Sequence, residues 1–438
     1  MADKNRTCAY QVLWNIEKNG AFSNLALSAA IEKDRPDAPR LVRELVYGVL
    51  EQQILLDYTI RKYLKQPVSK LGLAEKIVLR IGIWQMDFAN SIPEYAAVKE
   101  SVDLARKVCR GREGFINGVL RNHGRAGAIS EERPTRVDLP DRKQDPAEYL
   151  SVRYSCRRWI VDQWIGDYGE EQAEEMLKYS LETPDLVVRA NLMRTTRAEL
   201  KAALEALGAA AAEGNLSPAA LHVKGSDLLS TELFEKGHFS VQDESSMLAV
   251  ETLDPKPGET VIDICAAPGG KTLYMGERME NKGSLTACDV HGGKLSLISR
   301  EGKRIGVTIP KLKVRDGAAP EAPDFPPESA DKVLVDAPCS GLGVLRRKPE
   351  IKLHEAHEEL AGLPAKQAAI LANAAPIVKP GGRLVYSTCT VSKAENQQVT
   401  AAFLENHPQW EKETEIQLLP GKDGTDGFYI CSMIRKKG

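Results

Sequence analysis

The stretch ETVIDICAAPGGKTLYMGERM, residues 259–279, decides the fold of this chain. Its first part, ETVIDICAA, is apolar and predicts a buried strand, and GKTLYMGERM predicts the helix that follows. Gly269 and Gly270 stand at the junction, where the absence of a side chain lets a ligand approach the backbone. The stretch therefore predicts the first strand–turn–helix unit of an α/β domain.

The same alternation continues to the C-terminus. Further strands are predicted in GSLTACDV, IPKLKVRD, DKVLVDAP, GGRLVYSTC and DGFYICSMIRK, with helices in GKLSLISREGKRIG, AKQAAILANAAPIV and ENQQVTAAFLENH. This order predicts a doubly wound, mostly parallel sheet, which binds its ligands at the carboxyl ends of the strands. Asp289, Asp316, Asp336, Cys339 and Cys389 all fall at or near those ends.

The rest of the chain divides into three parts. Residues 1–123 are predicted to form an all-helical domain, because apolar residues recur there at helical spacing. Residues 124–147 are polar and aperiodic and are predicted to be a linker. Residues 148–236 are predicted to form a small α+β segment, and residues 237–438 the α/β domain.

Composition and charge indicate what kinds of partner and cellular compartment this protein can have. The 438 residues are 42% hydrophobic and 27% charged, with a formal net charge of −2, so a nucleic-acid partner would have to bind local basic patches. The N-terminus has no apolar signal region, and no apolar run approaches a membrane span, so we expect a cytoplasmic protein with no membrane contact. Eight dispersed cysteines then indicate reduced thiols.

The loop around the first strand predicts a particular kind of cofactor. DICAAPGGKT, residues 263–272, matches neither the dinucleotide fingerprint nor the P-loop, which disfavours a phosphate ligand. Asp289 ends the next strand, where an acid would hold ribose hydroxyls, and Asp316 could accept from an adenine amino group. A ligand with ribose and adenine but without phosphate fits S-adenosylmethionine. The alternative is that each aspartate only caps a helix.

Two cysteines occupy unusual positions, and several explanations compete. Cys339 lies in DAPCSG and Cys389 in YSTCT, each just after a predicted strand. Each could be a small buried hydrophobe, but a zinc pair is disfavoured without nearby histidine, and a disulfide is disfavoured in the cytosol. The functional hypothesis is a thiol that adds to carbon 6 of a pyrimidine, because carbon 5 lacks a usable lone pair.

That hypothesis assigns roles to two further residues. A free thiol has a pKa of about 8.5, so the attacking cysteine needs local help, for which Lys271 is the candidate. Asp336 could hold the cytosine edge at N3 and the amino group, which would stabilise the protonated N3 of an adduct. The residues alone do not say which cysteine attacks.

Four motifs in order carry a family resemblance: VQDESS, CAAPGGK, DAPCSG and YSTCT. With them the chain resembles the bacterial 16S rRNA cytosine-C5 methyltransferases of the Sun/RsmB type. The resemblance implies that Cys389 is the nucleophile and that Cys339 assists product release. It also implies a binding site for S-adenosylmethionine, made by Cys265, Ala266, Ala267, Pro268, Gly269, Gly270 and Lys271, together with Asp289, Asp316 and Asp336.

The N-terminal domain is similar to the helical RNA-binding fold of the antitermination factor NusB, through RELVYGVL, LRIGIWQM, IPEYAAVKESVDLA and GFINGVLRN. The resemblance implies a Rossmann-like methyltransferase domain, an RNA-binding segment at 148–236, a 16S rRNA partner, no metal and a monomer. Basic clusters occur at 106–121, 153–158 and 346–348; each could be only a solvated face, and the third, just past the DAPCSG motif, is the predicted phosphate contact. A tRNA cytosine methyltransferase and a non-catalytic ribosome-assembly factor remain as alternatives.

Overall fold

The computed structural model describes residues 3–126, 129, 134–225, 227–319, 325–354 and 360–437. The chain divides into two compact units. The helical unit contains Met1–Glu182 and Leu345–Glu355, and the α/β unit contains Thr183–Val344 and Ala356–Gly438. Within the described residues, no helix combines the length and the apolar content that crossing a lipid bilayer requires.

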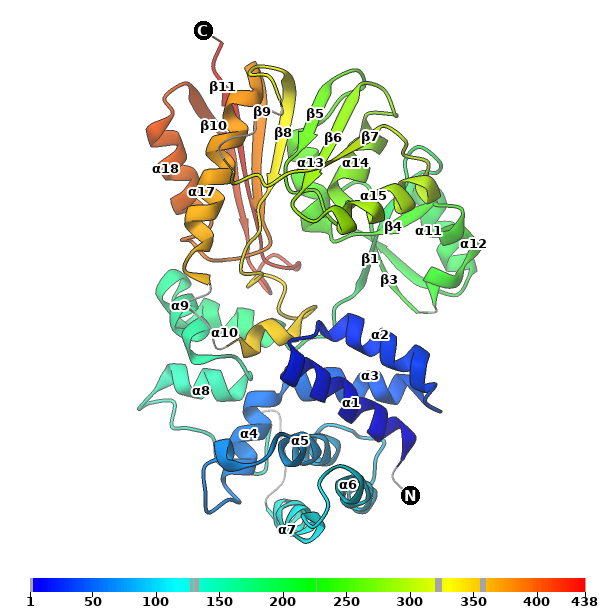
Figure 1. The fold of residues 1–438 in the computed structure, drawn as a ribbon, viewed down its shortest axis with the longest axis vertical. Helices are drawn as coiled ribbons and strands as arrows, with labels where there is room; N and C mark the ends of the chain where they lie inside the picture. Colours follow the sequence, from blue (N-terminus) through cyan, green and yellow to red (C-terminus); the bar gives the residue numbers. More distant parts are fainter. Residues whose placement is uncertain are drawn as a thin grey trace. The chain divides into compact units, whose positions relative to one another are not determined.

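The helical unit confirms the prediction of an all-helical N-terminal domain (Figure 1). Its core forms because the helices are amphipathic: α3 buries Val42, Leu45, Val46 and Val49 on one side. The described helices are α1 (Lys4–Asn19), α2 (Ser23–Asp34), α3 (Pro39–Glu51), α4 (Gln53–Arg61), α5 (Leu73–Asp87), α6 (Glu94–Val108), α7 (Glu113–Gly124), α8 (Pro146–Arg153), α9 (Arg158–Tyr168) and α10 (Glu170–Tyr179), with a 3-10 turn η1 (Val68–Lys70).

The linker predicted at 124–147 falls partly outside the described residues. Its described part from 134 to 145 contains neither helix nor strand, and α8 begins at Pro146. The boundaries of the four predicted parts stay a prediction, because the compact units follow a different division of the chain.

A short segment from the second half of the sequence belongs to the helical unit. The 3-10 turn η3 (Pro349–Leu353) packs on α3, and the carbonyl of Lys352 accepts a hydrogen bond of 3.1 Å from the amide of Arg157. Lys352 is fully buried, with its ammonium 3.4 Å from the Ser180 hydroxyl, and burial lowers its pKa to about 8. The predicted basic cluster 346–348 is therefore part of the helical unit.

The α/β unit begins with a small antiparallel sheet in the order β2-β3-β1-β4. The stretches DLVVRANL and RAELKAALEALG, which lie in the predicted α+β segment, form β1 and α11. The elements are β1 (Leu186–Ala190), α11 (Arg197–Ala206), β2 (Ala210–Glu213), β3 (Ala220–Lys224), η2 (Leu228–Ser230), α12 (Glu232–Glu235) and β4 (Phe239–Val241).

The larger sheet has the order β10-β11-β9-β8-β5-β6-β7, which confirms the prediction of a mostly parallel, doubly wound sheet. Strands β9, β8, β5, β6 and β7 run parallel, and β11 and β10 add to β9 as antiparallel strands. The bounds are β5 (Thr260–Asp263), β6 (Ser284–Asp289), β7 (Pro310–Val314), β8 (Ala330–Asp336), β9 (Val378–Thr388), β10 (Trp410–Leu418) and β11 (Phe428–Arg435).

The sequence did not predict β10, and its side chains explain why. WEKETEIQL carries exposed charged residues at its centre, as suits a strand at the edge of a sheet, and it lacks the apolar run that reveals a buried strand.

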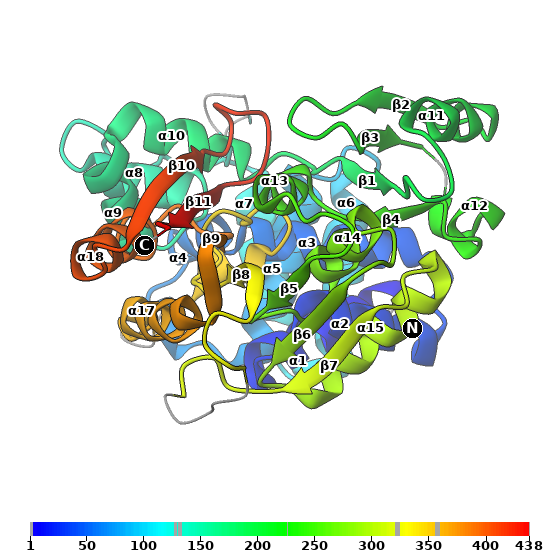
Figure 2. The ribbon, with the colours of Figure 1, turned by 90° about the horizontal axis from the view of Figure 1, so that it is seen from above.

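Helices cover both faces of this sheet (Figures 1 and 2). On β8, Leu334 shares a core with α13 and α14, whereas Val333 and Val335 share a core with α17 and α18 on the other face. This burial on both faces is why the strand is continuously apolar. The helices are α13 (Glu244–Leu253), α14 (Gly270–Arg278), α15 (Gly292–Ile305), α17 (Leu363–Ala374) and α18 (Gln397–Asn406), with the 3-10 turn η4 (Ala375–Ile377).

Candidate active site

A hollow of about 330 Å³ lies at the carboxyl ends of the parallel strands. Its size is within the range of small-molecule sites. Seven of the residues predicted from the sequence line it: Cys265, Ala267, Asp289, Asp316, Asp336, Cys339 and Cys389. The parallel register causes this convergence, since Asp336 pairs with Ser387 and both cysteines follow within three residues.

The turn after β5 is shaped by its glycines and by Asp289. Gly269 has a φ of 112°, and a Cβ there would lie 2.6 Å from the side chain of Ile298. The amide of Ala267 donates to Asp289 Oδ2 at 3.1 Å, which fixes the turn against the end of β6. The other predicted turn residues, Ala266, Pro268, Gly269, Gly270 and Lys271, form the turn and the start of α14 without lining the hollow.

The acids on β6 and β7 keep acceptor capacity on the hollow side. Asp289 Oδ1 accepts from the His291 amide at 2.8 Å, and Asp316 Oδ1 accepts from the Ala318 amide at 3.0 Å. A carboxylate oxygen accepts two hydrogen bonds, so both groups can accept from a ligand as well. Val290, which is 50% exposed, and Ile370 supply apolar walls. Carboxylates beside apolar walls fit a ligand with ribose hydroxyls and an adenine ring.

Arg315 also lines this hollow, and the sequence did not single it out. Its side chain lies 5.3 Å from the ring of Phe325 as a cation–π pair. Its Nε and Nη1 atoms are buried, and neither finds a hydrogen-bond acceptor among the described residues. Buried donors of this kind are rare, and their place in the lining leaves them able to donate to a ligand. Its position directly before Asp316 is the sequence signal that could have identified it.

The two predicted thiols are in contact. The Sγ atoms of Cys339 and Cys389 lie 3.3 Å apart, and both cysteines are half-buried thiols that form no disulfide. The hydrogen bond with Cys389 raises the pKa of the Cys339 thiol well above its usual value, and burial acts in the same direction. Burial also raises the pKa of the third nearby thiol, Cys265, so the turn cysteine is poorly suited to attack.

Lys271 and Asp336 form an ion pair beside the thiols. Lys271 Nζ lies 2.7 Å from Asp336 Oδ2, and the Ser387 hydroxyl donates to Asp336 Oδ1 at 2.8 Å. Burial alone would lower the pKa of Lys271, but the charge and the hydrogen bond of Asp336 more than offset it, so the pKa is raised. The charge of Cys389 acts on the pKa of Lys271 in the same direction as that of Asp336, with a smaller effect.

Asp263, at the end of β5, is the most perturbed acid of this region. Burial raises the pKa of this carboxyl to about 7, although the Thr272 hydroxyl donates to Oδ2 at 2.6 Å. Its Oδ1 atom is buried without a hydrogen-bond partner among the described residues. Such groups concentrate at functional sites.

No group of three or more histidine, cysteine, aspartate or glutamate side chains that could hold a metal ion occurs in the part of the chain that is described.

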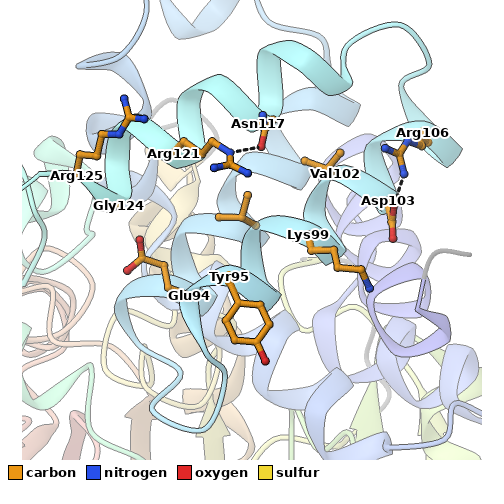
Figure 3. A pocket seen from close by; sticks show the side chains of 11 residues that line it. Glu94, Tyr95, Lys99, Val102, Asp103, Arg106, Asn117, Arg121, Gly124 and Arg125 are labelled. Atoms are coloured by element: carbon orange, nitrogen blue, oxygen red, sulfur yellow. Dashed lines mark hydrogen bonds and ion pairs between the residues drawn. The ribbon is translucent and has the colours of Figure 1, made fainter.

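The basic residues differ in their surroundings: some line a surface hollow, and others bond to neighbouring side chains. In the helical unit, Lys99, Arg106, Arg121 and Arg125 line a surface hollow of about 690 Å³ along α6 and α7, next to Tyr95, which is 77% exposed (Figure 3). Several predicted members pair with acids: Arg106 pairs with Asp103 in this hollow, Arg112 with Glu75, and Arg158 with Asp145 and Asp162. Lys107 donates to the Thr7 hydroxyl.

Three parts of the chain match known protein families. Residues 3–125 match the NusB family, and residues 157–227 match a ferredoxin-like domain of the RsmF/B-like methyltransferases. Residues 250–434 match the family "16S rRNA methyltransferase RsmB/F". The three matches confirm the predicted fold class: a helical NusB-like domain, a small α+β segment and a Rossmann-like methyltransferase domain.

Similar proteins extend over the whole chain. The "Probable ribosomal RNA small subunit methyltransferase B" of Bacillus subtilis is 40% identical, over 99% of both chains. The "Ribosomal RNA small subunit methyltransferase B" of Vibrio cholerae is 31% identical, over 98% of this chain and 97% of that protein. The crystal structure of PH0851 has 26% identity and a TM-score of 0.82, over 99% of both chains.

The sheet, the turn after β5 and the hollow at the strand ends define a methyltransferase, so the predicted enzyme class is confirmed. The similarity over the full length of the chain also identifies the family within this class. The chain belongs to the family of ribosomal RNA small subunit methyltransferase B, within the RsmB/F type that carries a NusB domain.

Proposed function

We propose that this protein transfers a methyl group from S-adenosylmethionine to carbon 5 of a cytosine in 16S rRNA, in the cytoplasm. The observation that carries the proposal is the 3.3 Å contact between the sulfur atoms of Cys339 and Cys389, at the mouth of a hollow that Asp289 and Asp316 also line. A methyltransferase acting on an amine or a hydroxyl has no use for a pair of thiols, whereas carbon 5 of cytosine must first be activated.

Cys389 is the proposed nucleophile. Its thiolate forms a bond to carbon 6, the electron pair of the C5–C6 bond moves toward carbon 5 and the ring, and N3 takes up a proton. Carbon 5 would then bond to the methyl group of S-adenosylmethionine as the bond between that methyl group and the sulfonium sulfur breaks, which leaves S-adenosylhomocysteine. Lys271 stabilises the thiolate through its positive charge, because the Cys389 charge already acts on this ammonium.

Cys339 is the proposed residue for product release. After it has given up its own proton to solvent, its thiolate accepts the proton from carbon 5, the electron pair re-forms the C5–C6 double bond, and the Cys389–C6 bond breaks to return the thiolate. N3 gives up its proton in the same recovery of the aromatic ring. Asp336, held by Lys271 and Ser387, is placed to stabilise the N3–H group while the adduct exists.

The proposed cofactor contacts follow the hollow and the turn. Asp289 would accept from the ribose hydroxyls and Asp316 from the adenine amino group, with Cys265–Lys271 supplying the backbone of the turn. The apolar walls at Val290 and Ile370 support this assignment, because an adenine ring needs apolar surface on its faces.

The helical unit is the proposed site of rRNA contact. Lys99, Arg106, Arg121 and Arg125 supply positive charge, and the exposed ring of Tyr95 offers a stacking surface for a base (Figure 3). Glu94 and Asp103 line the same hollow, so its four basic residues leave an excess of positive charge on a chain that is slightly acidic as a whole, and this excess supports the proposal. The target base must leave its stack to reach Cys389, and a monomer suffices for this scheme.

The test uses tritiated S-adenosylmethionine and 16S rRNA without modifications. Wild type is expected to label one cytosine at carbon 5, Cys389→Ala to label none, and Cys339→Ala to accumulate a protein–RNA adduct that survives denaturing electrophoresis. Cys109→Ala, which changes a half-buried cysteine of the helical unit, is the matched control and should behave as wild type.

Two results would overturn parts of the proposal. Label on tRNA and none on rRNA would refute the substrate while keeping the chemistry. Full methylation by Cys389→Ala would refute the nucleophile.

A further inference from the structure

The backbone on both sides of Cys339 is held by two side chains. The Ser340 amide donates to Glu395 Oε2 at 2.9 Å, and the Ser340 hydroxyl donates to Glu395 Oε1 at 2.5 Å. On the other side, Gln367 Nε2 donates to the Pro338 carbonyl at 3.0 Å and also to Glu395 Oε2 at 2.9 Å. Glu395 is therefore the common acceptor for the turn that carries Cys339.

The backbone around Cys389 is held by the next residue of the chain. The Thr388 hydroxyl donates to Asn396 Oδ1 at 2.6 Å, and Asn396 Nδ2 donates to the Thr390 carbonyl at 3.0 Å. Asn396 is fully buried, so water does not compete for these bonds. The two consecutive residues Glu395 and Asn396 therefore hydrogen-bond to both turns, Glu395 to the turn of Cys339 and Asn396 to the turn of Cys389.

A chain of hydroxyl groups joins the two turns directly. The Thr390 and Ser340 hydroxyl oxygens lie 2.7 Å apart. Because the single proton of Ser340 goes to the Glu395 carboxylate, Thr390 must donate to Ser340. The Gly343 amide adds a second link by donating to the Cys389 carbonyl at 3.0 Å.

Burial of the Glu395 carboxylate costs free energy, which a purely structural role would not require. It is 5% exposed, and no lysine, arginine or histidine forms an ion pair with it in the described parts of the chain. A buried carboxylate without a cation costs free energy, which the three hydrogen bonds that it accepts only partly offset. Its charge also helps to raise the pKa of Cys339, which favours a protonated Cys339 while Cys389 attacks.

We propose that Glu395 and Asn396 form a clamp that sets the spacing of the two thiols, with Glu395 positioning Cys339 and Asn396 positioning Cys389. The inference rests on the proposed roles of the two cysteines and adds a division of labour between adjacent residues. Loss of Glu395 should therefore impair product release, and loss of Asn396 should impair attack on carbon 6.

The decisive experiment measures turnover and the protein–RNA adduct for Glu395→Ala and Asn396→Ala with 16S rRNA and S-adenosylmethionine. Glu395→Ala is expected to accumulate adduct, with a turnover about 100-fold below wild type and an almost unchanged KM for RNA, since a misplacement of about 1 Å costs that much. Asn396→Ala is expected to lose both turnover and adduct. Glu395→Gln, which keeps a hydrogen-bonding side chain, should recover turnover to within about tenfold of wild type.

The chain offers a matched pair of controls. Glu405 and Asn406 are the same two residue types in the same order, exposed near the end of α18. Glu405→Ala and Asn406→Ala should behave as wild type. Thr388→Val removes the hydroxyl that Asn396 holds with little change of volume, and it should reproduce the loss of adduct if Asn396→Ala fails to fold.

A second readout needs neither RNA nor cofactor. Diamide takes two hydrogen atoms from a pair of adjacent thiols and leaves a disulfide, so the rate of Cys339–Cys389 crosslinking, followed by peptide mapping, reports how often the sulfur atoms meet. Wild type should crosslink quickly because they are 3.3 Å apart. Glu395→Ala and Asn396→Ala should both crosslink at least tenfold more slowly, and Glu395→Gln at close to the wild-type rate.

The outcomes separate the clamp from the proposed function. If Cys389→Ala still methylates rRNA, the thiol mechanism is wrong, and the crosslinking rates still decide whether the clamp exists. If the cysteine variants behave as expected but Glu395→Ala and Asn396→Ala block the same step, the division of labour is refuted. Wild-type crosslinking rates in both variants would refute the clamp itself.

Discussion

Asp263→Asn is expected to stabilise the α/β unit, and to do so increasingly as the pH rises. The Asp263 carboxyl is 1% exposed, and burial raises its pKa from 3.8 to about 7. Folding therefore disfavours its ionised form, so wild type loses stability as the pH rises from about 4 to about 7. Asparagine keeps an oxygen that accepts from the Thr272 hydroxyl but cannot ionise, and it escapes this loss.

The size of the effect follows from the pKa difference. At 1.36 kcal/mol for each pH unit, the interval between 3.8 and about 7 corresponds to a maximum of about 4 kcal/mol. Near pH 5 the advantage of the variant should be about 1.5 kcal/mol, and at pH 8 about 4 kcal/mol. The slope with pH matters more than either value, because the change of residue also alters packing by an amount that does not depend on pH.

Hydrogen–deuterium exchange of the full chain provides the assay. Amides of β5 and β8 report the free energy of opening of the α/β unit, after correction for the intrinsic exchange rate at each pH. Asp331→Asn, on β8, is a control of opposite sign. Burial acts to raise the pKa of the Asp331 carboxyl, but hydrogen bonds from Lys379 and the Thr260 amide outweigh burial, so the pKa is lowered. The ionised carboxylate therefore stabilises the folded chain, and Asp331→Asn should lose that stability above pH 4.

An Asp263→Asn advantage that stays constant between pH 5 and pH 8 would refute the reasoning. It would mean that the buried carboxyl ionises as easily in the folded chain as in the unfolded one.

Three further changes test other parts of the α/β unit. Gly343→Ala would place a Cβ against the Gly427 carbonyl and 2.9 Å from the Cys389 carbonyl, so turnover should fall about 100-fold while calorimetry shows unchanged cofactor affinity. Arg189→Met leaves the buried Glu277 without its partner at 2.6 Å and should cost about 3–5 kcal/mol in urea denaturation. Asp289→Ala removes a charged acceptor, so the same calorimetric titration should show binding of S-adenosylmethionine that is weaker by about tenfold or more. An unchanged affinity would show that Asp289 does not contact the cofactor.

Much of the site could be predicted from the sequence because its residues sit at the ends of strands. A continuous apolar run ends where a strand leaves the core, so Asp289, Asp336 and Cys389 could be placed at one edge of the sheet before any coordinates were known. The exposed strand β10 lacked this signal, because an edge strand made of charged residues has no apolar pattern.

Residues whose role depends on packing could not be predicted in this way. Arg315 and Asp263 are notable only because buried atoms of each find no partner among the described residues, and burial is a property of the packed chain. The segment around Lys352 belongs to the helical unit although the sequence places it inside the methyltransferase domain, since contiguity along the chain does not determine which core a segment joins.

By itself, the sequence determined the fold class, the glycine-containing turn after the first strand and the positions of the two cysteines at strand ends, because the apolar pattern of a strand and the residues that follow it are local in the chain. Only the tertiary structure decided that the two sulfur atoms touch and that Glu395 and Asn396 hold the turns around them. Fifty residues separate the two cysteines, and a contact of 3.3 Å between them exists only where parallel strands bring their carboxyl ends together.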